Sequence, residues 1–139
     1  MNHHNAPLPQ PRFEGVCLVT RDVGRLRAFY EMLLGIEGEG DDQHVQLSPA
    51  GASLTIFSTR GMEEMAPGSM AGAGIGSTIL GFELSGGPAA IDAAHARLLE
   101  LDIPIVKPPE TYPWGTRSVW FRDPDGNIVN VYARTVEGA

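Results

Sequence analysis

The chain has 139 residues, of which 42% are hydrophobic, and this length and composition suit one folded domain with its own core. Seventeen acidic residues against ten basic ones give a formal net charge of -7, which disfavours nucleic acid and other polyanionic partners. A single cysteine excludes an internal disulfide, and the lack of a signal-like or membrane-length apolar run predicts a cytoplasmic protein with no membrane partner.

The first half of the chain predicts a strand, a helix and a β-hairpin. Residues 1–12 carry several prolines and no apolar period, so we expect a flexible leader there. The stretch "FEGVCLVT" (13–20) is β-like, and a helix is predicted over 22–35, with Asp22 as its N-cap and Gly35 as its stop. The β-like runs "HVQLS" and "ASLTIFS" are separated by "PAG", which predicts a hairpin turn.

The second half repeats this order of elements. The run "TILGFELS" predicts a strand, Pro88 opens a predicted helix, and "IPIVKP", "TRSVWF" and "NIVNVYAR" predict three further strands. The simplest description is one domain over residues 13–139 with two β-α-β-β-β modules, at about 13–60 and 77–135. The Gly- and Met-rich segment 61–76 has no sustained period and is predicted to be a linker or a mobile lid.

Two motifs, one in each module, carry a resemblance to a known family. "FYEMLLG" closes the first predicted helix, and "FRDPDGN" precedes the last predicted strand. Together with the repeated order of elements, they resemble the glyoxalase/bleomycin resistance/dioxygenase group, the vicinal oxygen chelate superfamily. The resemblance covers Phe13 to Arg134 and implies an α+β fold in which curled mixed sheets form cups, helices lie outside, and two chains form a homodimer.

The segment "DPDGN" has a structural explanation that is independent of the family. Pro124 restricts one φ angle, the side chain of Asp123 can accept a hydrogen bond within the turn, and Gly126 accommodates positive φ. We therefore expect a tight connection between antiparallel strands, and not a metal or acid–base site formed by the two aspartates.

Strand alternation predicts which side chains face the cup. On the last strand Val129 and Val131 suit the helix-covered core, which leaves Asn130 on the other face. The same argument turns Trp120 toward the cup, although an ordinary core position remains an equally good explanation for this residue. Among the other residues that alternation turns toward the cup are Gly15, Cys17, Thr55, Phe57, Gly81 and Glu83.

The resemblance also implies four positions for metal ligands. Metal-dependent relatives place His, Glu or Gln at positions that correspond here to Gly15, Thr55, Gly81 and Asn130. None of these residues is a strong ligand for a divalent transition metal, so no family-type metal and no other cofactor is expected. A register slip of one residue would bring Glu14 inward, but it would also turn the alternate apolar set to solvent.

Aromatic residues and two glycines favour an organic ligand. The glycines at positions 15 and 81 are expected to leave space on the floor of the cup, with flat aromatic walls provided by Trp120, Phe57 and Trp114. Glu83 is expected either to pair with Arg117 or Arg122 or to present its carboxylate to a cation.

Three classes of function follow from these residues. The first is a small-molecule-binding protein of the bleomycin-resistance type that takes a neutral or cationic organic ligand, with no catalytic residue identified. The second is a metal-dependent lyase, isomerase, transferase or ring-cleaving dioxygenase. The third is a structural dimer whose cup is filled by side chains.

Overall fold

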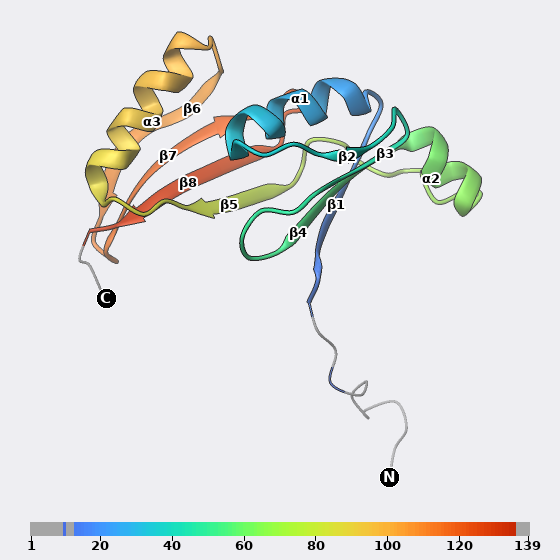
Figure 1. Ribbon diagram of the computed structural model, residues 1–139, viewed down its shortest axis with the longest axis horizontal. Helices are drawn as coiled ribbons and strands as arrows, with labels where there is room; N and C mark the ends of the chain where they lie inside the picture. The colour runs from blue at the N-terminus through green and yellow to red at the C-terminus, as the bar shows by residue number, and fades with distance from the viewer. Residues whose placement is uncertain (1–9, 11–12, 136–139) are drawn as a thin grey trace. The chain divides into compact units, whose positions relative to one another are not determined.

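The computed structural model describes Gln10 and residues 13–135, and it divides the chain after Pro67 into two compact units. The predicted leader, residues 1–12, lies outside this range apart from Gln10. The order β-α-β-β-β occurs in each unit, so the repeat predicted from the sequence is confirmed (Figure 1). The division of the chain falls within the segment that was expected to link the two modules.

The first unit is built on a four-stranded mixed sheet. The strand order is β1-β4-β3-β2, with β1 parallel to β4 and antiparallel pairing elsewhere. Helix α1 packs against β3 and β4 and covers one face of this sheet. The elements are β1 (Gly15–Thr20), α1 (Val23–Leu34), β2 (Glu39–Gly40), β3 (His44–Leu47), β4 (Ser53–Ser58) and α2 (Thr59–Met65).

Helix α1 begins and ends as its sequence predicts. The Asp22 side chain accepts a hydrogen bond from the backbone N–H of Arg25 at 3.1 Å, and Gly35 closes the helix in the left-handed region with φ of 66°. The helix buries Leu26 and Tyr30 completely against the sheet. The other fully or nearly fully buried apolar residues of this unit are Leu18, Val23, Val45, Leu47, Leu54 and Ile56.

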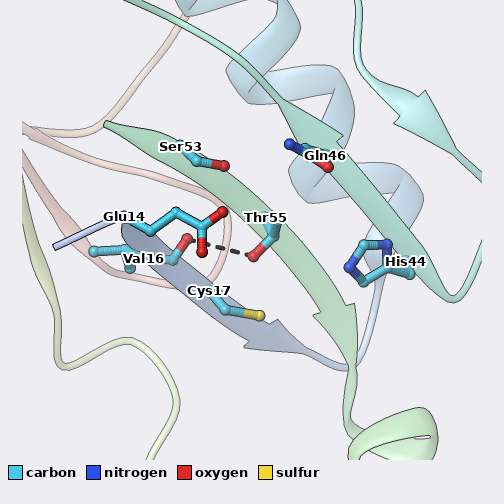
Figure 2. Close-up of a pocket in the computed structure, with 8 residues that line it drawn as sticks. Glu14, Val16, Cys17, His44, Gln46, Ser53 and Thr55 are labelled. Carbon is cyan, nitrogen blue, oxygen red and sulfur yellow. Dashed lines mark hydrogen bonds between the residues drawn. The ribbon is translucent and has the colours of Figure 1, made fainter. Parts of the chain in front are cut away.

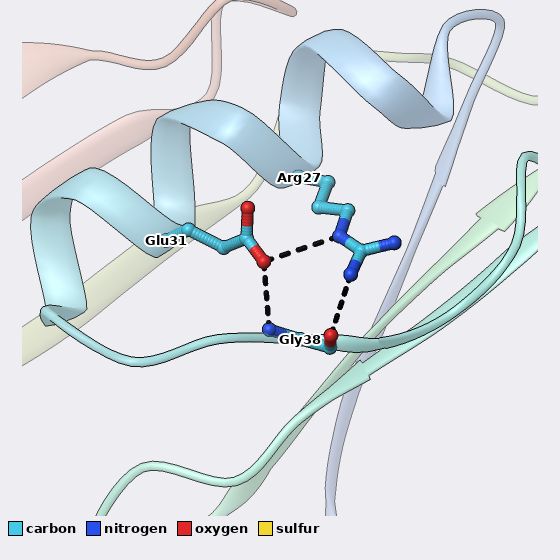
Figure 3. Close-up of polar contacts among 3 residues, drawn as sticks. All are labelled: Arg27, Glu31 and Gly38. Carbon is cyan, nitrogen blue, oxygen red and sulfur yellow. Dashed lines mark hydrogen bonds and ion pairs between the residues drawn. The ribbon is translucent and has the colours of Figure 1, made fainter.

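A carboxylate ties α1 to the segment that follows it (Figure 3). Glu31 Oε2 accepts from Arg27 Nε at 3.1 Å and from the backbone N–H of Gly38 at 2.8 Å, and Arg27 Nη2 donates to the Gly38 carbonyl at 2.6 Å. The backbone hydrogen bond from Gly38, aided by the Arg27 guanidinium, lowers the pKa of Glu31.

The second unit repeats the same topology. Its strand order is β5-β8-β7-β6, with β5 parallel to β8, and helix α3 packs against β6, β7 and β8 (Figure 1). The core between helix and sheet contains Leu80, Ile91, Leu98, Val119, Phe121, Val129, Val131 and Ala133. The elements are β5 (Ile79–Glu83), α3 (Pro88–Glu100), β6 (Ile105–Tyr112), β7 (Thr116–Arg122) and β8 (Ile128–Arg134).

The turn between β7 and β8 confirms the structural explanation of "DPDGN". Asp123 is 5% exposed, and its Oδ1 accepts from the backbone N–H groups of Asp125 and Asn127, each at 2.9 Å. Its Oδ2 accepts from Asn127 Nδ2 at 2.8 Å, and Gly126 has φ of 90°. The carboxylate of Asp123 is therefore used within the turn.

Helix α2 was not predicted from the sequence. The segment 61–76 was expected to be a linker or lid, but its first residues belong to the seven-residue helix α2. Ser58 caps this helix by accepting from the Gly61 N–H at 2.8 Å. A helix this short spans only about two turns, too few to reveal a period in the sequence, and Gly61 in its first turn reads as a breaker.

Candidate functional site

The face of the second sheet that is turned away from α3 brings together four of the nine predicted ligand-binding residues, which are Gly81, Glu83, Trp120 and Asn130. Strand pairing places Gly81 opposite Asn130, Asn130 opposite Trp120, and Trp120 opposite Lys107, so these side chains form one row across four strands. Directly opposed residues share a face of the sheet. Trp120 therefore lies on this open face, while its neighbours Val119 and Phe121 are fully buried on the helix side.

Glu83 forms an ion pair, but with a different arginine from those predicted. Its carboxylate accepts from Arg134 Nε at 3.0 Å. Arg117 instead pairs with Asp92 of α3 at 2.8 Å, and Arg122 donates to a carbonyl of its own hairpin turn. The prediction was wrong because β5 is hydrogen-bonded to β8, so the arginines of β7 lie one strand farther away.

Glu83 and Arg134 also line a hollow of about 570 Å³, whose wall is formed by residues 84–88 and Thr135. The hollow lies where β5 leads into α3 through Gly86 and Gly87. The two charged side chains are each about half exposed, so their pairing is accessible to water.

The two glycines of the predicted cup floor play different roles. A Cβ at Gly81 would meet nothing within 4 Å, so this position opens space beside Asn130, which lies between Gly81 and Trp120. A Cβ at Gly15 would collide with the backbone carbonyl of Ser53 on the paired strand. The expectation that Gly15 leaves room for a ligand is therefore wrong, because its hydrogen side chain is needed for the close approach of β1 to β4.

Trp114 lies on the turn between β6 and β7 and is 71% exposed. Its indole stacks on Tyr112, with ring centroids 4.5 Å apart and planes 9° from parallel. Lys107 lies over the same Tyr112 ring and pairs with Glu110 at 2.6 Å, which raises the pKa of Lys107 and lowers that of Glu110. One face of Trp114 is thus covered by Tyr112, and its role in ligand binding stays a prediction.

The open face of the first sheet carries a polar cavity of about 290 Å³ (Figure 2). Cys17 on β1, Thr55 on β4 and Gln46 on β3 lie in one row across the strands. Thr55 Oγ1 donates to the carbonyl of Val16 at 3.4 Å. The cavity is lined by Glu14, Gly15, Val16, Cys17, His44, Gln46, Ser53 and Thr55.

Sequence reasoning missed Glu14 as a member of this cavity. Alternation turned Glu14 away from Gly15 and Cys17, but Glu14 precedes the first residue of β1 and its side chain does not follow the strand's alternation. Figure 2 shows its carboxylate reaching over the start of β1 toward Thr55. Gln46 was also missed, although the alternation of "HVQL", with Val45 and Leu47 buried, identifies it.

Phe57 lies beside this cavity and not in its lining. Its ring meets His44 edge-on, with centroids 5.5 Å apart, and a Cβ at Gly61 of α2 would come within 2.6 Å of it. Phe57 belongs to the first sheet, whereas Trp120 and Glu83 belong to the second. A ligand cavity common to these three residues stays a prediction.

The residues at the family's metal positions do not fit a transition-metal site. Gly15 and Gly81 have no side-chain donor, while Thr55 and Asn130 offer only neutral oxygen or nitrogen atoms. By strand pairing, the second-sheet counterpart of Gly15 is Ile79, which likewise has no donor. Within residues 10 and 13–135, no group of three or more His, Cys, Asp or Glu side chains is placed to hold a metal ion.

Asn130 has an unusual environment for a polar side chain. Its Oδ1 is buried and has no hydrogen-bond partner among the described residues. An unsatisfied buried acceptor costs free energy, on the order of 1–3 kcal/mol, unless water or a ligand supplies a donor. Asn130 pairs with Gly81, so this side chain lies next to the open space over Gly81.

Comparison with known proteins identifies one family. The family model described as Glyoxalase/Bleomycin resistance protein/Dioxygenase superfamily matches residues 12–131. The comparison with curated proteins gave no match. None of the described helices is long and apolar enough to span a membrane.

Solved structures of similar fold cover nearly the whole chain. A glyoxalase/bleomycin resistance protein/dioxygenase from Nocardioides is 27% identical with a TM-score of 0.76, over 98% of this chain and 91% of that one. A lactoylglutathione lyase from Agrobacterium tumefaciens is 24% identical with a TM-score of 0.73, over 95% of this chain and 100% of that one. A glyoxalase/bleomycin resistance protein/dioxygenase family enzyme from Burkholderia phytofirmans is 16% identical with a TM-score of 0.78, over 89% of this chain and 99% of that one.

Proposed function

Since the chain belongs to the glyoxalase/bleomycin resistance protein/dioxygenase superfamily, we propose that it binds a small organic molecule, neutral or cationic, without the metal ion of its metal-dependent relatives. This proposal depends on which residues stand at the four positions where metal-dependent relatives have their metal ligands. Two glycines, a threonine and an asparagine supply no carboxylate, imidazole or thiolate. Binding, and not metal-assisted chemistry, is what these positions support.

The open face of the second sheet supports a flat ligand. Asn130 lies between Trp120 and the space over Gly81 in one row across the strands, and Ile79, on the same face of β5, is 62% exposed. A planar ring laid on this surface would bury apolar area against the indole and isoleucine. The unpartnered acceptor of Asn130 would gain a partner from a ligand N–H or O–H group.

The charge of the chain supports a neutral or cationic ligand over an anionic one. The formal net charge of -7 raises the local concentration of cations near the protein and repels anions. The gap over Gly81 also favours a binding protein over a structural dimer with a filled cup, because a filled cup would place side chains in that gap.

The test uses three probes that share one ring system and differ in charge. 2-Naphthalenemethanol and 2-naphthylmethylamine should each raise Tm by mass action, and 2-naphthoate should raise it less. Trp120→Ala should weaken binding of the alcohol at least fivefold, whereas Trp120→Phe should keep most of the affinity because it retains an aromatic face.

Three outcomes would contradict the proposal. One is a purified protein that carries one Ni, Zn, Mn or Fe per chain by elemental analysis. Another is the lack of any Tm increase with all three probes. The last is a Trp120→Ala variant that loses much stability but binds the alcohol unchanged, which would make Trp120 a packing residue only.

A further inference from the structure

The carboxylates of Glu83 and Glu14 differ in whether they are free to bind a cationic ligand. Glu83 on the second sheet is already paired with Arg134 at 3.0 Å, so a cationic ligand would have to displace an arginine. The carboxylate of Glu14, just before β1, forms no hydrogen bond or ion pair with any described residue, yet Glu14 lines a cavity. Of these two carboxylates, Glu14 is therefore the one available to a ligand.

The atoms around Glu14 are suited to a group that donates several hydrogen bonds. Thr55 uses its hydroxyl hydrogen toward the Val16 carbonyl, which leaves the oxygen lone pairs free to accept. Figure 2 shows the Glu14 carboxylate and the Thr55 hydroxyl on the same side of the strands. Gln46 adds a further amide oxygen on the neighbouring strand β3. An ammonium group has three N–H donors and no acceptor, which matches such a wall.

We infer that the cavity on the first sheet binds the ammonium group of a primary organic amine, with Glu14 as its counter-charge and Thr55 as a second acceptor. This inference rests on the proposed function, because it names the ligand class for one of the two open faces. A bare metal ion fits the cavity less well, since no three His, Cys, Asp or Glu side chains of the described residues converge there. An anion would be repelled by the Glu14 carboxylate, which has no partner among the described residues.

The single cysteine of the chain provides a site-specific report of occupancy. Cys17 is exposed and lines the same cavity as Glu14. A molecule held by Glu14 and Thr55 would cover the Cys17 thiol and slow its alkylation by iodoacetamide, a neutral reagent. Because the chain contains one cysteine, the modified mass of the intact protein reports this site alone.

The experiment measures the alkylation rate of full-length protein against increasing 2-naphthylmethylamine, with 2-naphthalenemethanol as the uncharged counterpart. We expect the amine to protect Cys17 and the alcohol to protect it at least fivefold less well. Glu14→Gln should weaken protection by the amine roughly tenfold, as for loss of one charge-assisted hydrogen bond in a partly solvated site. Glu14→Asp should keep most of the protection.

Glu100→Gln is the matched control. It removes one exposed carboxylate of α3 and changes the net charge equally, so protection of Cys17 should stay as in the unchanged protein. Comparing each variant with and without probe cancels any change in the intrinsic reactivity of the thiol. Tm of each variant without probe verifies that it is folded.

Several results would overturn the inference. Equal protection in Glu14→Gln and the unchanged protein, or equal protection by alcohol and amine, would remove the counter-charge role of Glu14. A probe that raises Tm but leaves Cys17 unprotected would sink the inference and leave the proposed function standing. If no naphthyl probe raises Tm and none protects Cys17, both the inference and the proposed function are refuted.

Discussion

Replacing Gly15 by alanine should destabilise the first unit, although the change adds a single methyl group. Gly15 pairs with Ser53 across the parallel strands β1 and β4. A Cβ at this position would overlap the Ser53 carbonyl oxygen and come within 2.7 Å of its carbon and 2.8 Å of the Ser53 amide nitrogen. All three atoms belong to the backbone, so the overlap can be relieved only by moving one strand away from the other.

The expected loss of stability in Gly15→Ala is the sum of two costs, reduced by one favourable contribution. Forcing a methyl group into a filled space costs about 1–3 kcal/mol, and weakening the hydrogen bond from Ser53 N–H to the Glu14 carbonyl adds about 1 kcal/mol. The smaller conformational freedom of alanine in the unfolded chain offsets about 0.5–1 kcal/mol of this. The net loss should be about 1–3.5 kcal/mol, or roughly 3–12 °C in Tm for a chain of this size.

Gly81→Ala is the matched control, because a Cβ there meets nothing within 4 Å. Its stability should be unchanged or higher by up to about 1 kcal/mol. Thermal and urea unfolding should be followed by far-UV circular dichroism, since both tryptophans, Trp114 and Trp120, lie in the second unit. A loss below about 0.5 kcal/mol for Gly15→Ala would refute the close approach of β1 and β4.

Further outcomes are expected elsewhere in the chain. Asp123→Ala should lower stability by about 2–3 kcal/mol in urea unfolding, because three hydrogen bonds to a buried carboxylate are lost. Asp125→Ala, which removes an unpartnered buried oxygen, should not lower stability and should raise it by up to about 1 kcal/mol, and equal losses for both variants would contradict this explanation. The pKa of Glu31 is lowered by the Gly38 N–H, so its stabilising effect is complete above its ordinary value of 4.5 and is lost as pH falls through the lower folded-state value. Glu31→Gln should therefore lower Tm at pH 7 and flatten the decline of Tm in acid, and an unchanged acid profile would exclude this role. Light scattering at micromolar concentration should give the mass of a homodimer, because pairing would cover the open edges of β1 and β5, and a monomer mass would count against it.

Local patterns of the sequence determined the elements and the two faces of each sheet. Alternation on the last strand separated Val129 and Val131 from Asn130, since successive side chains of a strand point to opposite faces. Asp22 and Gly35 marked the ends of α1, because a side-chain acceptor and a left-handed residue satisfy the ends of a helix through neighbouring atoms. These effects act within a few residues and are therefore visible in the sequence.

Only the tertiary structure decided which distant groups meet. Glu83 pairs with Arg134 because β5 lies beside β8, a neighbour that is 45 or more residues away in the chain. Gly15 is required by the backbone of Ser53, which no local pattern around Gly15 indicates. Glu14 joins the polar cavity because it stands just before β1, where alternation no longer orients the side chain. Strand order and close backbone approach arise from non-local pairing, and for that reason they could not be predicted from the periodicity of the sequence.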